Sequence, residues 1–458
     1  MIPVWAQVAY LIAAMCFVLS LRGLSSPKSA RMGTLIGAVG ATGAVVVTFF
    51  AYDLDNLPWI FGAIAVGCLI GVPAARKVAM TAMPQLVALF NGVGGGAAAL
   101  VAYLELTEAE PVVPLAAAVA TIAIGSVAFS GSVVTFLKLQ ELMTTRPVIP
   151  PAGPVLFGAS LVALAALLGW SYSAGGDSLG LAAVLGAVAL LVGVLLVLPV
   201  GGADVPIVIS LLNALTGLAV AAGGYVLGNA LLLIGGTLVG ASGTILTRMM
   251  AAAMGRSVSA ILFGAFRART AGASGADGAD RPVRSAGPDD IAIMLSFARK
   301  VMVVPGYGLA VAQAQHTVNE LADLLESRGI EVSYAIHPVA GRMPGHMNVL
   351  LAEANVPYER LHEMAAANPE LRTTDVALVV GANDVVNPAA KTTPSAPIYG
   401  MPILDVDMAK SVVFLKRSMR PGFAGIGNEL MYDPKTTLMF GDAKDSLTKL
   451  VAAVKNLN

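Results

Sequence analysis

The sequence is poor in charge, in cysteine and in histidine. Only 12% of its 458 residues are charged, and the formal net charge at pH 7 is zero. A protein without an excess of positive charge is not expected to bind nucleic acid. The two cysteines, Cys16 and Cys68, both lie in apolar runs, which excludes a disulfide framework. No histidine occurs in residues 1–300, and no metal site is predicted.

The charges that are present are unevenly distributed along the chain. Residues 1–250 contain only 8 of the 28 basic residues and 8 of the 28 acidic residues. Hydrophobic residues make up 57% of the whole chain, which is unusually high for a soluble protein. A chain of this length also has room for more than one domain. The composition therefore indicates a membrane-embedded half followed by a water-soluble half.

The first half contains segments long and apolar enough to cross a bilayer, which takes roughly 20 residues. We predict nine such spans, at about 4–22, 32–52, 57–74, 83–105, 113–138, 154–174, 179–199, 206–227 and 229–250. The first span is too long for a cleaved signal peptide, and no basic region precedes it. We therefore expect a multi-pass membrane protein.

The charges in the short connections predict the orientation of these spans. Basic residues follow the first, third and fifth spans: Arg22, Lys28, Arg31, Arg76, Lys77, Lys138 and Arg146. The connections on the other side carry acids and no Lys or Arg: Asp53, Asp55, Glu105, Glu108, Glu110 and Asp177. The positive-inside rule places the basic connections in the cytoplasm. With nine spans, the N-terminus is then expected outside and the soluble half inside.

The soluble half follows a polar linker. Residues 270–288 have a small and polar composition that is typical of flexible linkers. We predict a polytopic α-helical membrane domain of about nine transmembrane helices over 1–254 and a cytoplasmic linker over 255–288. A separate water-soluble domain is predicted over 289–458.

Strand-like and helical segments alternate after the linker. Strands are predicted at 301–304, 331–336, 376–380, 403–406 and 411–415. Besides the helix after the first strand, helices are predicted near 289–299, 346–354, 358–367 and 443–456. Such alternation predicts an α/β Rossmann-like domain with a doubly wound parallel sheet.

The first predicted strand ends in a glycine turn. Gly306 permits the turn and Gly308 lets the backbone approach a pyrophosphate, which the N-terminus of the next helix would attract. We expect this helix to run on through Ala314 to Leu325. Val311 occupies the third glycine position, so the motif is an imperfect dinucleotide fingerprint. Alone, it fits an ordinary strand–helix turn equally well.

The end of the second strand favours NADP(H) over NAD(H). An NAD site places an acid there for the ribose 2′-hydroxyl, but the strand ends at Ile336 and Glu331 lies at its start. Arg342 and the pair Lys416-Arg417, which follows the last predicted strand, can supply cations for a 2′-phosphate. The alternative for Lys416-Arg417 is a solvated strand end.

Four acidic and amide residues each allow a structural and a functional interpretation. Asp384 follows the strand at 376–380 and can cap a turn, or lie near the cofactor and couple its protonation to binding. Asp204 precedes the eighth span and can be a helix N-cap or a functional acid. Asn91 and Asn213 lie inside spans, where they can join helices by hydrogen bonds or line a hydrated path.

Longer motifs resemble one known family. They comprise residues 201–204, 305–315, 337–348, 381–384, 416–419 and 441–444. Together they resemble the beta subunit of proton-translocating NAD(P) transhydrogenase, and the resemblance spans the whole chain. It implies hydride transfer between NADH and NADP+ that is coupled to proton movement across the membrane. In that family the NADP(H) domain binds its cofactor in a flipped orientation.

The resemblance also implies partners and a location. Only one dinucleotide fingerprint is present, so NAD(H) is expected on an alpha subunit, or subunits, which would add further transmembrane helices. The implied assembly is a dimer of alpha–beta units in the lipid bilayer of a bacterial inner (plasma) membrane. The N-terminus would lie outside and the NADP(H) domain in the cytoplasm.

By position, the resemblance implies two groups of functional residues and no catalytic side chain. The NADP(H) ligands would be Gly306, Tyr307, Gly308, Leu309, Ala310, Val311, Arg342, Met343, Pro344, Gly345, Gly381, Ala382, Asn383, Asp384, Lys416, Arg417, Gly441 and Asp442. The proton pathway would include Asn91, Asp204 and Asn213. Many relatives have a histidine where this chain has Asn91, so the protonatable group is expected on a partner subunit. Relatives often have a tyrosine at the position of Phe423.

Two other functions fit parts of the sequence. A transporter or channel regulated by a nucleotide-sensing Rossmann domain would combine the same two halves without redox turnover. A membrane anchor that only positions NADP(H) would not need Asp204 and Asn213 in a region otherwise nearly free of polar groups.

Overall fold

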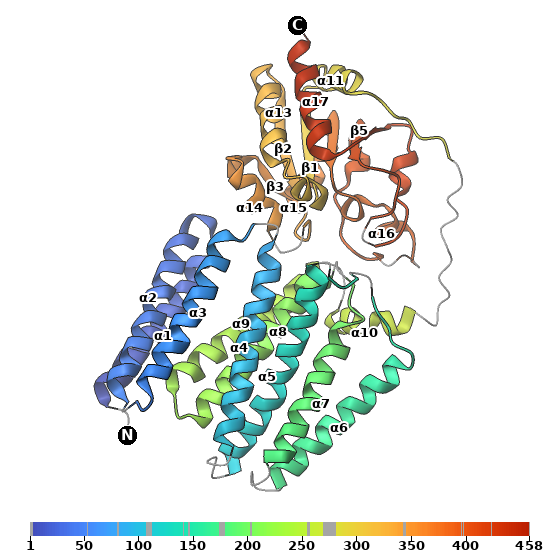
Figure 1. Ribbon diagram of the computed structural model, residues 1–458. Helices are drawn as coiled ribbons and strands as arrows, with labels where there is room; N and C mark the ends of the chain where they lie inside the picture. The colour runs from blue at the N-terminus through green and yellow to red at the C-terminus, as the bar shows by residue number, and fades with distance from the viewer. Residues whose placement is uncertain are drawn as a thin grey trace. The chain divides into compact units, whose positions relative to one another are not determined.

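The computed structural model describes the chain outside residues 1–2, 53, 80–81, 107–111, 141, 145–146, 174–178, 202–203, 254–256, 269–280, 342–344, 395, 397, 423 and 458. The chain forms two compact units (Figure 1). One comprises Met1–Gly201 and Ile207–Thr247, and the other comprises Gly202–Pro206 and Arg248–Asn458.

The first unit is helical, as its composition predicts. Within the described ranges, nine helices are long and apolar enough to cross a membrane, and they lie at the nine predicted positions. They are α1 (Val4–Leu24), α2 (Pro27–Ala51), α3 (Leu57–Lys77), α4 (Met83–Glu105), α5 (Val112–Leu139), α6 (Gly153–Ser173), α7 (Leu179–Val197), α8 (Val205–Val226) and α9 (Ala230–Ala253). A shorter helix, α10 (Val258–Ala268), lies in the predicted linker.

Small residues allow α4 and α5 to pack closely. A Cβ atom on Gly125 of α5 would lie 2.6 Å from the carbonyl oxygen of Gly95 on α4. A Cβ atom on Gly95 would in turn lie 3.1 Å from the Cβ of Ala128. Membrane helices use such glycines to bring their backbones together, so close packing accounts for these two positions.

Lys138 is a charged residue buried in the first unit. Its side chain is fully buried near the end of α5. The ammonium group donates hydrogen bonds to the carbonyl oxygens of Val197, Leu198 and Val200, at 3.2, 2.5 and 2.7 Å. The last carbonyls of a helix lack partners within the helix. Lys138 therefore holds the end of α7 and the segment that leads toward α8.

The second unit contains a six-stranded parallel sheet in the order β3-β2-β1-β4-β5-β6. The strands are β1 (Lys300–Pro305), β2 (Glu331–Ile336), β3 (Leu361–Glu363), β4 (Val376–Val380), β5 (Ser411–Lys416) and β6 (Thr436–Phe440). The helices are α11 (Pro288–Ser296), α12 (Tyr307–Val311), α13 (Gln315–Ser327), α14 (His346–Glu353), α15 (Met364–Leu371), α16 (Ala389–Thr392) and α17 (Ala443–Asn456). The described part of residues 281–457 also contains four 3₁₀ turns: η3 (Tyr358–Arg360), η4 (Asp384–Val386), η5 (Val406–Met408) and η6 (Glu429–Tyr432).

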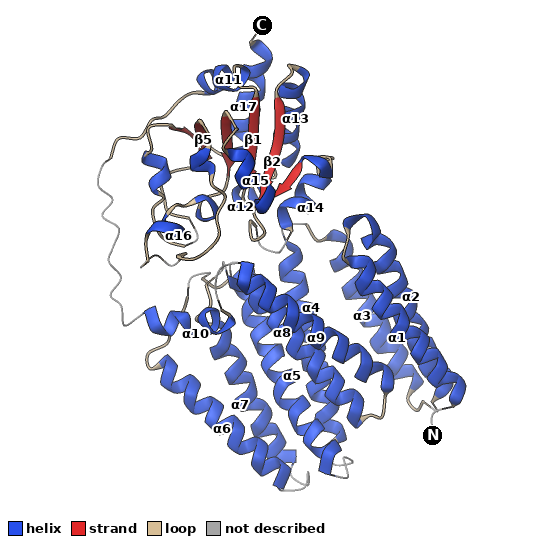
Figure 2. Ribbon diagram, turned by 180° about the vertical axis from the view of Figure 1, so that it is seen from behind, coloured by secondary structure: helices blue, strands red, loops and turns tan. Residues whose placement is uncertain are grey.

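The sheet is covered on both faces (Figure 2). Alternate strand residues pack with α11, α13 and α17 in one buried cluster. The intervening strand residues pack with α15 and η5 in a second cluster. This arrangement confirms the predicted doubly wound parallel sheet.

The predicted strand at 403–406 is wrong, because its backbone bonds to the Asn368 side chain and to the η4 turn rather than to a neighbouring strand. The Asn368 side chain donates to the carbonyl oxygen of Ile403 at 3.0 Å and accepts from the backbone N–H of Asp405 at 3.0 Å. The N–H of Leu404 donates to the carbonyl oxygen of Val385 at 2.9 Å. The segment joins no strand ladder, and its last residue, Val406, begins η5.

Three other predictions differ from the observed elements. The helix expected near 358–367 is replaced by η3, the three-residue strand β3 and then α15. Strand β6 was not expected, since it begins with two threonines rather than an apolar run. The helix expected to run through Ala314 is broken: α12 ends at Val311, α13 begins at Gln315, and Gln313 between them has φ +49°.

Candidate functional site

The candidate site lies at the carboxyl edge of the sheet, where β1 and β4 are neighbours. The chain leaves β1 toward β2 on one side, whereas β4 leads to β5 on the other. Ligands of doubly wound sheets bind at such a switch point. The two turns that follow β1 and β4 therefore form the centre of the site.

These two turns are packed backbone against backbone. The N–H of Gly306 donates to the carbonyl oxygen of Val380 at 2.9 Å, and that of Gly308 donates to the carbonyl oxygen of Gly381 at 2.9 Å. A Cβ atom on Gly306 would lie 2.4 Å from the Cα of Ala382, and one on Gly308 would lie 2.7 Å from the Cα of Gly381. The glycines of the predicted fingerprint are thus required by the contact between the turns.

The residues after the glycine turn are placed in a short helix. Helix α12 has five residues, so it has too few turns to supply the helix dipole that the sequence suggested. The side chains of Leu309 and Ala310 are fully buried in the core. The whole residues, backbone included, are 0% exposed, whereas Val311 is 46% exposed.

A loop between β5 and η6 lies on the turn after β4. The backbone N–H of Ala424 donates to Asp384 Oδ2 at 2.8 Å, and Asn383 Nδ2 donates to Asp384 Oδ1 at 3.1 Å. A Cβ atom on Gly422 would lie 2.3 Å from Asn383 Nδ2. Asp384 therefore fixes the loop above it, a role that the sequence did not predict.

Lys416 ends β5 beside this turn. Its ammonium group makes only long contacts among the described residues, at 3.5 Å to Asn383 Oδ1 and 3.5 Å to Met431 Sδ. Burial lowers the pKa of Lys416 below its ordinary value, while the negative charge of Asp384 acts in the opposite direction. A half-buried cation with such weak partners can accept an anion such as a phosphate. The adjacent Arg417 is exposed.

A second glycine turn lies next to Lys416. The N–H of Gly441 donates to the carbonyl oxygen of Lys416 at 3.1 Å, and Gly441 has φ +155°. Asp442 caps α17 by accepting from the N–H of Lys444 at 3.0 Å. The structure therefore brings together the turns after β1, β4, β5 and β6, as a common carboxyl edge requires.

The loop after β2 is described at its ends only. Arg342, Met343 and Pro344 lie outside the described residues, as does Phe423. Gly345 has φ +70° and is the N-cap residue of α14.

His337 is an anchor of this edge that the sequence did not single out. Its Nε2 lies 2.8 Å from the carbonyl oxygen of Pro402, and the N–H of Val339 donates to its Nδ1 at 3.3 Å. These partners fit a neutral ring whose Nε2–H donates to Pro402. Burial lowers the pKa of His337, and the hydrogen bond to Pro402 acts against that shift. The ring therefore ties the end of β2 to the segment before η5.

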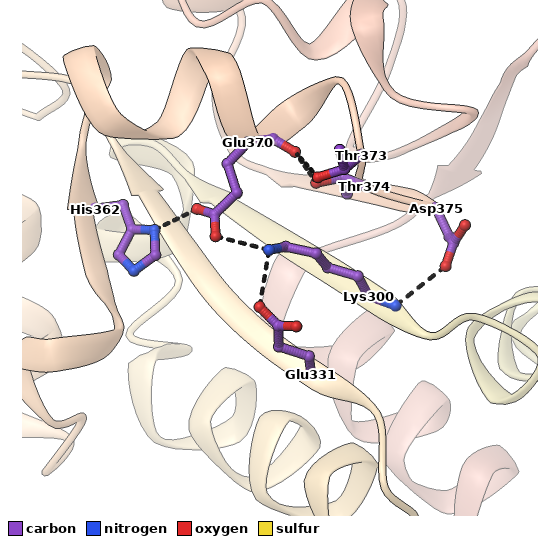
Figure 3. A network of polar contacts seen from close by, with 7 residues as sticks. All are labelled: Lys300, Glu331, His362, Glu370, Thr373, Thr374 and Asp375. Carbon is purple, nitrogen blue, oxygen red and sulfur yellow. Dashed lines mark hydrogen bonds and ion pairs between the residues drawn. The ribbon is translucent and has the colours of Figure 1, made fainter.

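The opposite, amino edge of the sheet carries a separate polar network (Figure 3). Lys300 Nζ lies 2.8 Å from Glu331 and 2.7 Å from Glu370, and His362 Nδ1 bonds to the other oxygen of Glu370. Within the described part of the chain, no group of three or more His, Cys, Asp or Glu side chains could hold a metal ion. The network joins β1, β2, β3 and α15.

The polar residues of the membrane helices are in different environments. Asn91 Nδ2 donates to Ser132 Oγ at 2.9 Å, which joins α4 to α5, while Asn91 Oδ1 is buried with no hydrogen bond to a described residue. Thr216 Oγ1 on α8 is likewise buried and unpaired in the described structure. Asp204 is 7% exposed at the start of α8, and Asn213 is exposed on that helix.

Comparison with known proteins covers nearly the whole chain. Residues 6–453 match the family model described as NAD(P) transhydrogenase beta subunit. The chain is 48% identical to "NAD(P) transhydrogenase subunit beta" of Rhodospirillum rubrum, in an alignment that covers 97% of this chain and 98% of the relative. A second match, from a named strain of that organism, has the same identity and coverage.

Proposed function

The chain belongs to the NAD(P) transhydrogenase beta subunit family, and on that basis we propose that its sheet binds NADP(H). We further propose that its membrane helices form part of a proton path coupled to hydride transfer between NADH and NADP+. Membership of this family favours an enzyme subunit over a nucleotide-regulated transporter or channel. The expected domains remain a membrane domain at 1–254, a linker at 255–288 and the NADP(H) domain at 289–458.

The observation that carries the cofactor assignment is the position of Lys416. NADP(H) differs from NAD(H) by a 2′-phosphate, and Lys416 is a half-buried cation with only long contacts among the described residues. The end of β2 offers no acid for a 2′-hydroxyl, because Ile336 is followed by the buried His337. When bound, the nicotinamide ring supplies the hydride chemistry, and the residues of this edge hold and orient the cofactor.

Hydride transfer between two dinucleotides requires a second cofactor site. The described part of the chain contains one parallel sheet, which we assign to NADP(H). We therefore assign NAD(H) to an alpha subunit. The resemblance to the family implies that the active form is a dimer of alpha–beta units. The exposed amide of Asn213, in the middle of the apolar helix α8, supports a polar contact with a helix of that partner.

The proposed location is the inner (plasma) membrane of a bacterium. The basic connections would face the cytoplasm together with the NADP(H) domain, and the N-terminus would lie outside. Asp204, Asn213 and Asn91 are the proposed members of the proton path. Asn91 has one buried oxygen with no partner among the described residues, which a water molecule or a partner group can satisfy.

The cofactor assignment is tested by titrating NADPH and NADH into the purified chain in detergent. In a Lys416→Met variant, the Kd for NADPH should rise roughly 10- to 150-fold, because a charge-assisted contact contributes about 1.5–3 kcal/mol. Lys410→Met is the matched control, because Lys410 directly precedes the other end of β5 and pairs with Asp375 at 2.6 Å.

The control variant should bind NADPH as the wild type does. Equal weakening by both substitutions would show that charge near β5 acts without a specific site. An NADH affinity as high as that for NADPH in the wild type would contradict the assignment of NADP(H) to this chain.

A further inference from the structure

The chain segment that precedes α11 in the second unit forms part of the edge of the sheet. Ser285 makes a parallel bridge with Leu438 of β6. The N–H of Leu438 donates to the carbonyl oxygen of Arg284 at 2.8 Å, and the N–H of Ala286 donates to the carbonyl oxygen of Leu438 at 3.0 Å. The end of the predicted linker is thus bonded along β6, which would otherwise be the exposed edge strand.

Arg281, at the start of this segment, holds both ends of η6. Its Nη1 donates to Glu429 Oε2 at 2.7 Å, and its Nη2 donates to Glu429 Oε1 at 3.1 Å. Its Cζ lies 4.8 Å from the centre of the Tyr432 ring. A planar guanidinium can make a two-pronged carboxylate contact and a cation–π contact together, which a lysine cannot match.

The other side of η6 contacts the candidate cofactor site. Asn428, which caps η6, donates from Nδ2 to the carbonyl oxygen of Asn383 at 3.2 Å. Met431 Sδ lies 3.5 Å from Lys416 Nζ. The turn η6 and its cap Asn428 therefore contact Arg281 of the linker on one side. On the other side they contact Asn383 and Lys416, which are proposed to bind the cofactor.

We propose that Arg281 is a positioning residue through which the linker sets the geometry of the NADP(H) site. A shift of residues 281–287 moves Glu429 and Tyr432, and with them Asn428 and Met431 relative to Asn383 and Lys416. Linkage requires that cofactor binding acts on the linker by the same amount. This inference rests on the proposed NADP(H) site, and it goes beyond that proposal by naming the contact that joins the linker to it.

The exposure of the ion pair suits this role. The side chains of Arg281 and Glu429 are 50% and 61% exposed, so the pair is weak and can open and close. A purely structural clamp at a sheet edge would stabilise the fold without changing how hydride transfer is coupled to proton movement. A positioning role of Arg281 therefore predicts a change in the number of protons moved per hydride when the ion pair is removed, whereas a purely structural role predicts none.

The test uses the complex of this chain with its alpha partner in sealed vesicles. The variants are Arg281→Gln and Glu429→Gln, with Arg284→Gln as the matched control. Arg284 lies in the same segment and contributes its backbone to the bridge, and no side-chain hydrogen bond or ion pair joins it to another described residue. The measurements are the KM for NADPH, kcat, and the ratio of protons to hydrides.

Arg281→Gln and Glu429→Gln should each raise the KM for NADPH about three- to tenfold, as expected for an exposed ion pair with a cation–π contact. Both should also lower the ratio of protons to hydrides, and Arg284→Gln should change neither quantity. The exchanged pair, Arg281→Glu with Glu429→Arg, should recover part of the KM and of the ratio. If a single variant fails to assemble, this exchanged pair and Arg281→Lys provide the comparison.

An unchanged ratio and KM in Arg281→Gln, with normal NADPH binding by the wild type and Arg284→Gln, would overturn the role of Arg281 alone. A wild-type chain that does not bind NADPH would instead overturn the proposed function. Equal changes in Arg281→Gln and Arg284→Gln would also contradict a specific contact.

Discussion

Two lysines in this chain show how the same side chain serves different purposes. Lys138 is fully buried, and its ammonium donates to three backbone carbonyls at the end of α7. Lys416 is half-buried, and its ammonium makes only long contacts among the described residues. A buried charge needs close partners. Lys138, with three close hydrogen-bond acceptors, is therefore structural, whereas Lys416, with only long contacts, fits a ligand site.

The carboxyl group of Glu370 should make the stability of the second unit sensitive to acid. Burial raises its pKa, but hydrogen bonds from Lys300 and His362 and their charges outweigh burial, so that the pKa lies below its ordinary value of 4.5. A depressed pKa in the folded state adds stability above pH 4.5, which is lost as the pH falls through the folded-state pKa. Glu370→Gln should therefore lower the free energy of unfolding at pH 7 and reduce its dependence on pH below 4.5.

Hydrogen exchange of the amides of β1 and β2, corrected for the intrinsic effect of pH, measures this difference. Glu359→Gln is the control, because Glu359 lies in η3 and forms no ion pair with a described residue. Wild-type hydrogen-exchange rates in both variants at pH 7 and at pH 4 would contradict the proposed contribution of the Glu370 carboxylate to stability.

At the scale of elements, the glycine turns after β1 and β4 depend on each other. A Cβ atom on Gly306 would lie 2.4 Å from backbone atoms of Ala382 and Gly381. Gly306→Ala must separate the turns, at a cost of about 1–3 kcal/mol for an overpacked contact, and NADPH binding should weaken with it. Gly287→Ala is the control, because the nearest atom to its added Cβ would be Asp290 Oδ2, at 3.9 Å.

Calorimetry with NADPH and thermal denaturation of both variants measure these effects. Wild-type affinity and stability in Gly306→Ala would show that the two turns are not in contact.

Elements with strong local signals were predicted correctly from the sequence. Strands β2 and β4 and helix α17 begin and end where their apolar patterns do. Two of the misses have tertiary causes: the 403–406 segment bonds to the Asn368 side chain, and β6 starts with Thr436 and Thr437, which are buried although they are polar. Neither cause can be read from a local pattern.

The candidate site was predictable in position but not in internal structure. Parallel strands bring their carboxyl ends to one edge, so Lys416, Asp384 and Gly306 could be placed together from the sequence. The contact of Ala424 with Asp384 depends on a loop 40 residues away in sequence, and the contact of His337 with Pro402 spans 65 residues. Local sequence motifs do not predict contacts between residues so far apart in the chain.

At the scale of the whole molecule, the charge pattern of the connections predicts the orientation in the membrane. In a background with Cys16 and Cys68 replaced by serine, Glu108→Cys should react with an impermeant thiol reagent added outside cells. Ser274→Cys should react only after the membrane is opened. Labelling of both positions from one side would contradict the predicted orientation of the nine spans.

The central claim is that NADP(H) chemistry in this chain is coupled to protons that move through its own helices. Asp204 lies at the start of α8, nine residues before Asn213, which is about two and a half helical turns. Asp204→Asn can still cap a helix but cannot ionise. It therefore separates a structural acid from a proton relay.

The decisive measurement is proton movement across the membrane of sealed vesicles during hydride transfer from NADH to NADP+ by the assembled complex. The wild type and Asp55→Asn, a control at an exposed acid between α2 and α3, should move protons in step with NADPH formation. Asp204→Asn should slow both processes while the complex stays intact. Wild-type proton movement in Asp204→Asn would contradict the proposed path, and NADPH formation without proton movement in the wild type would contradict the coupling itself.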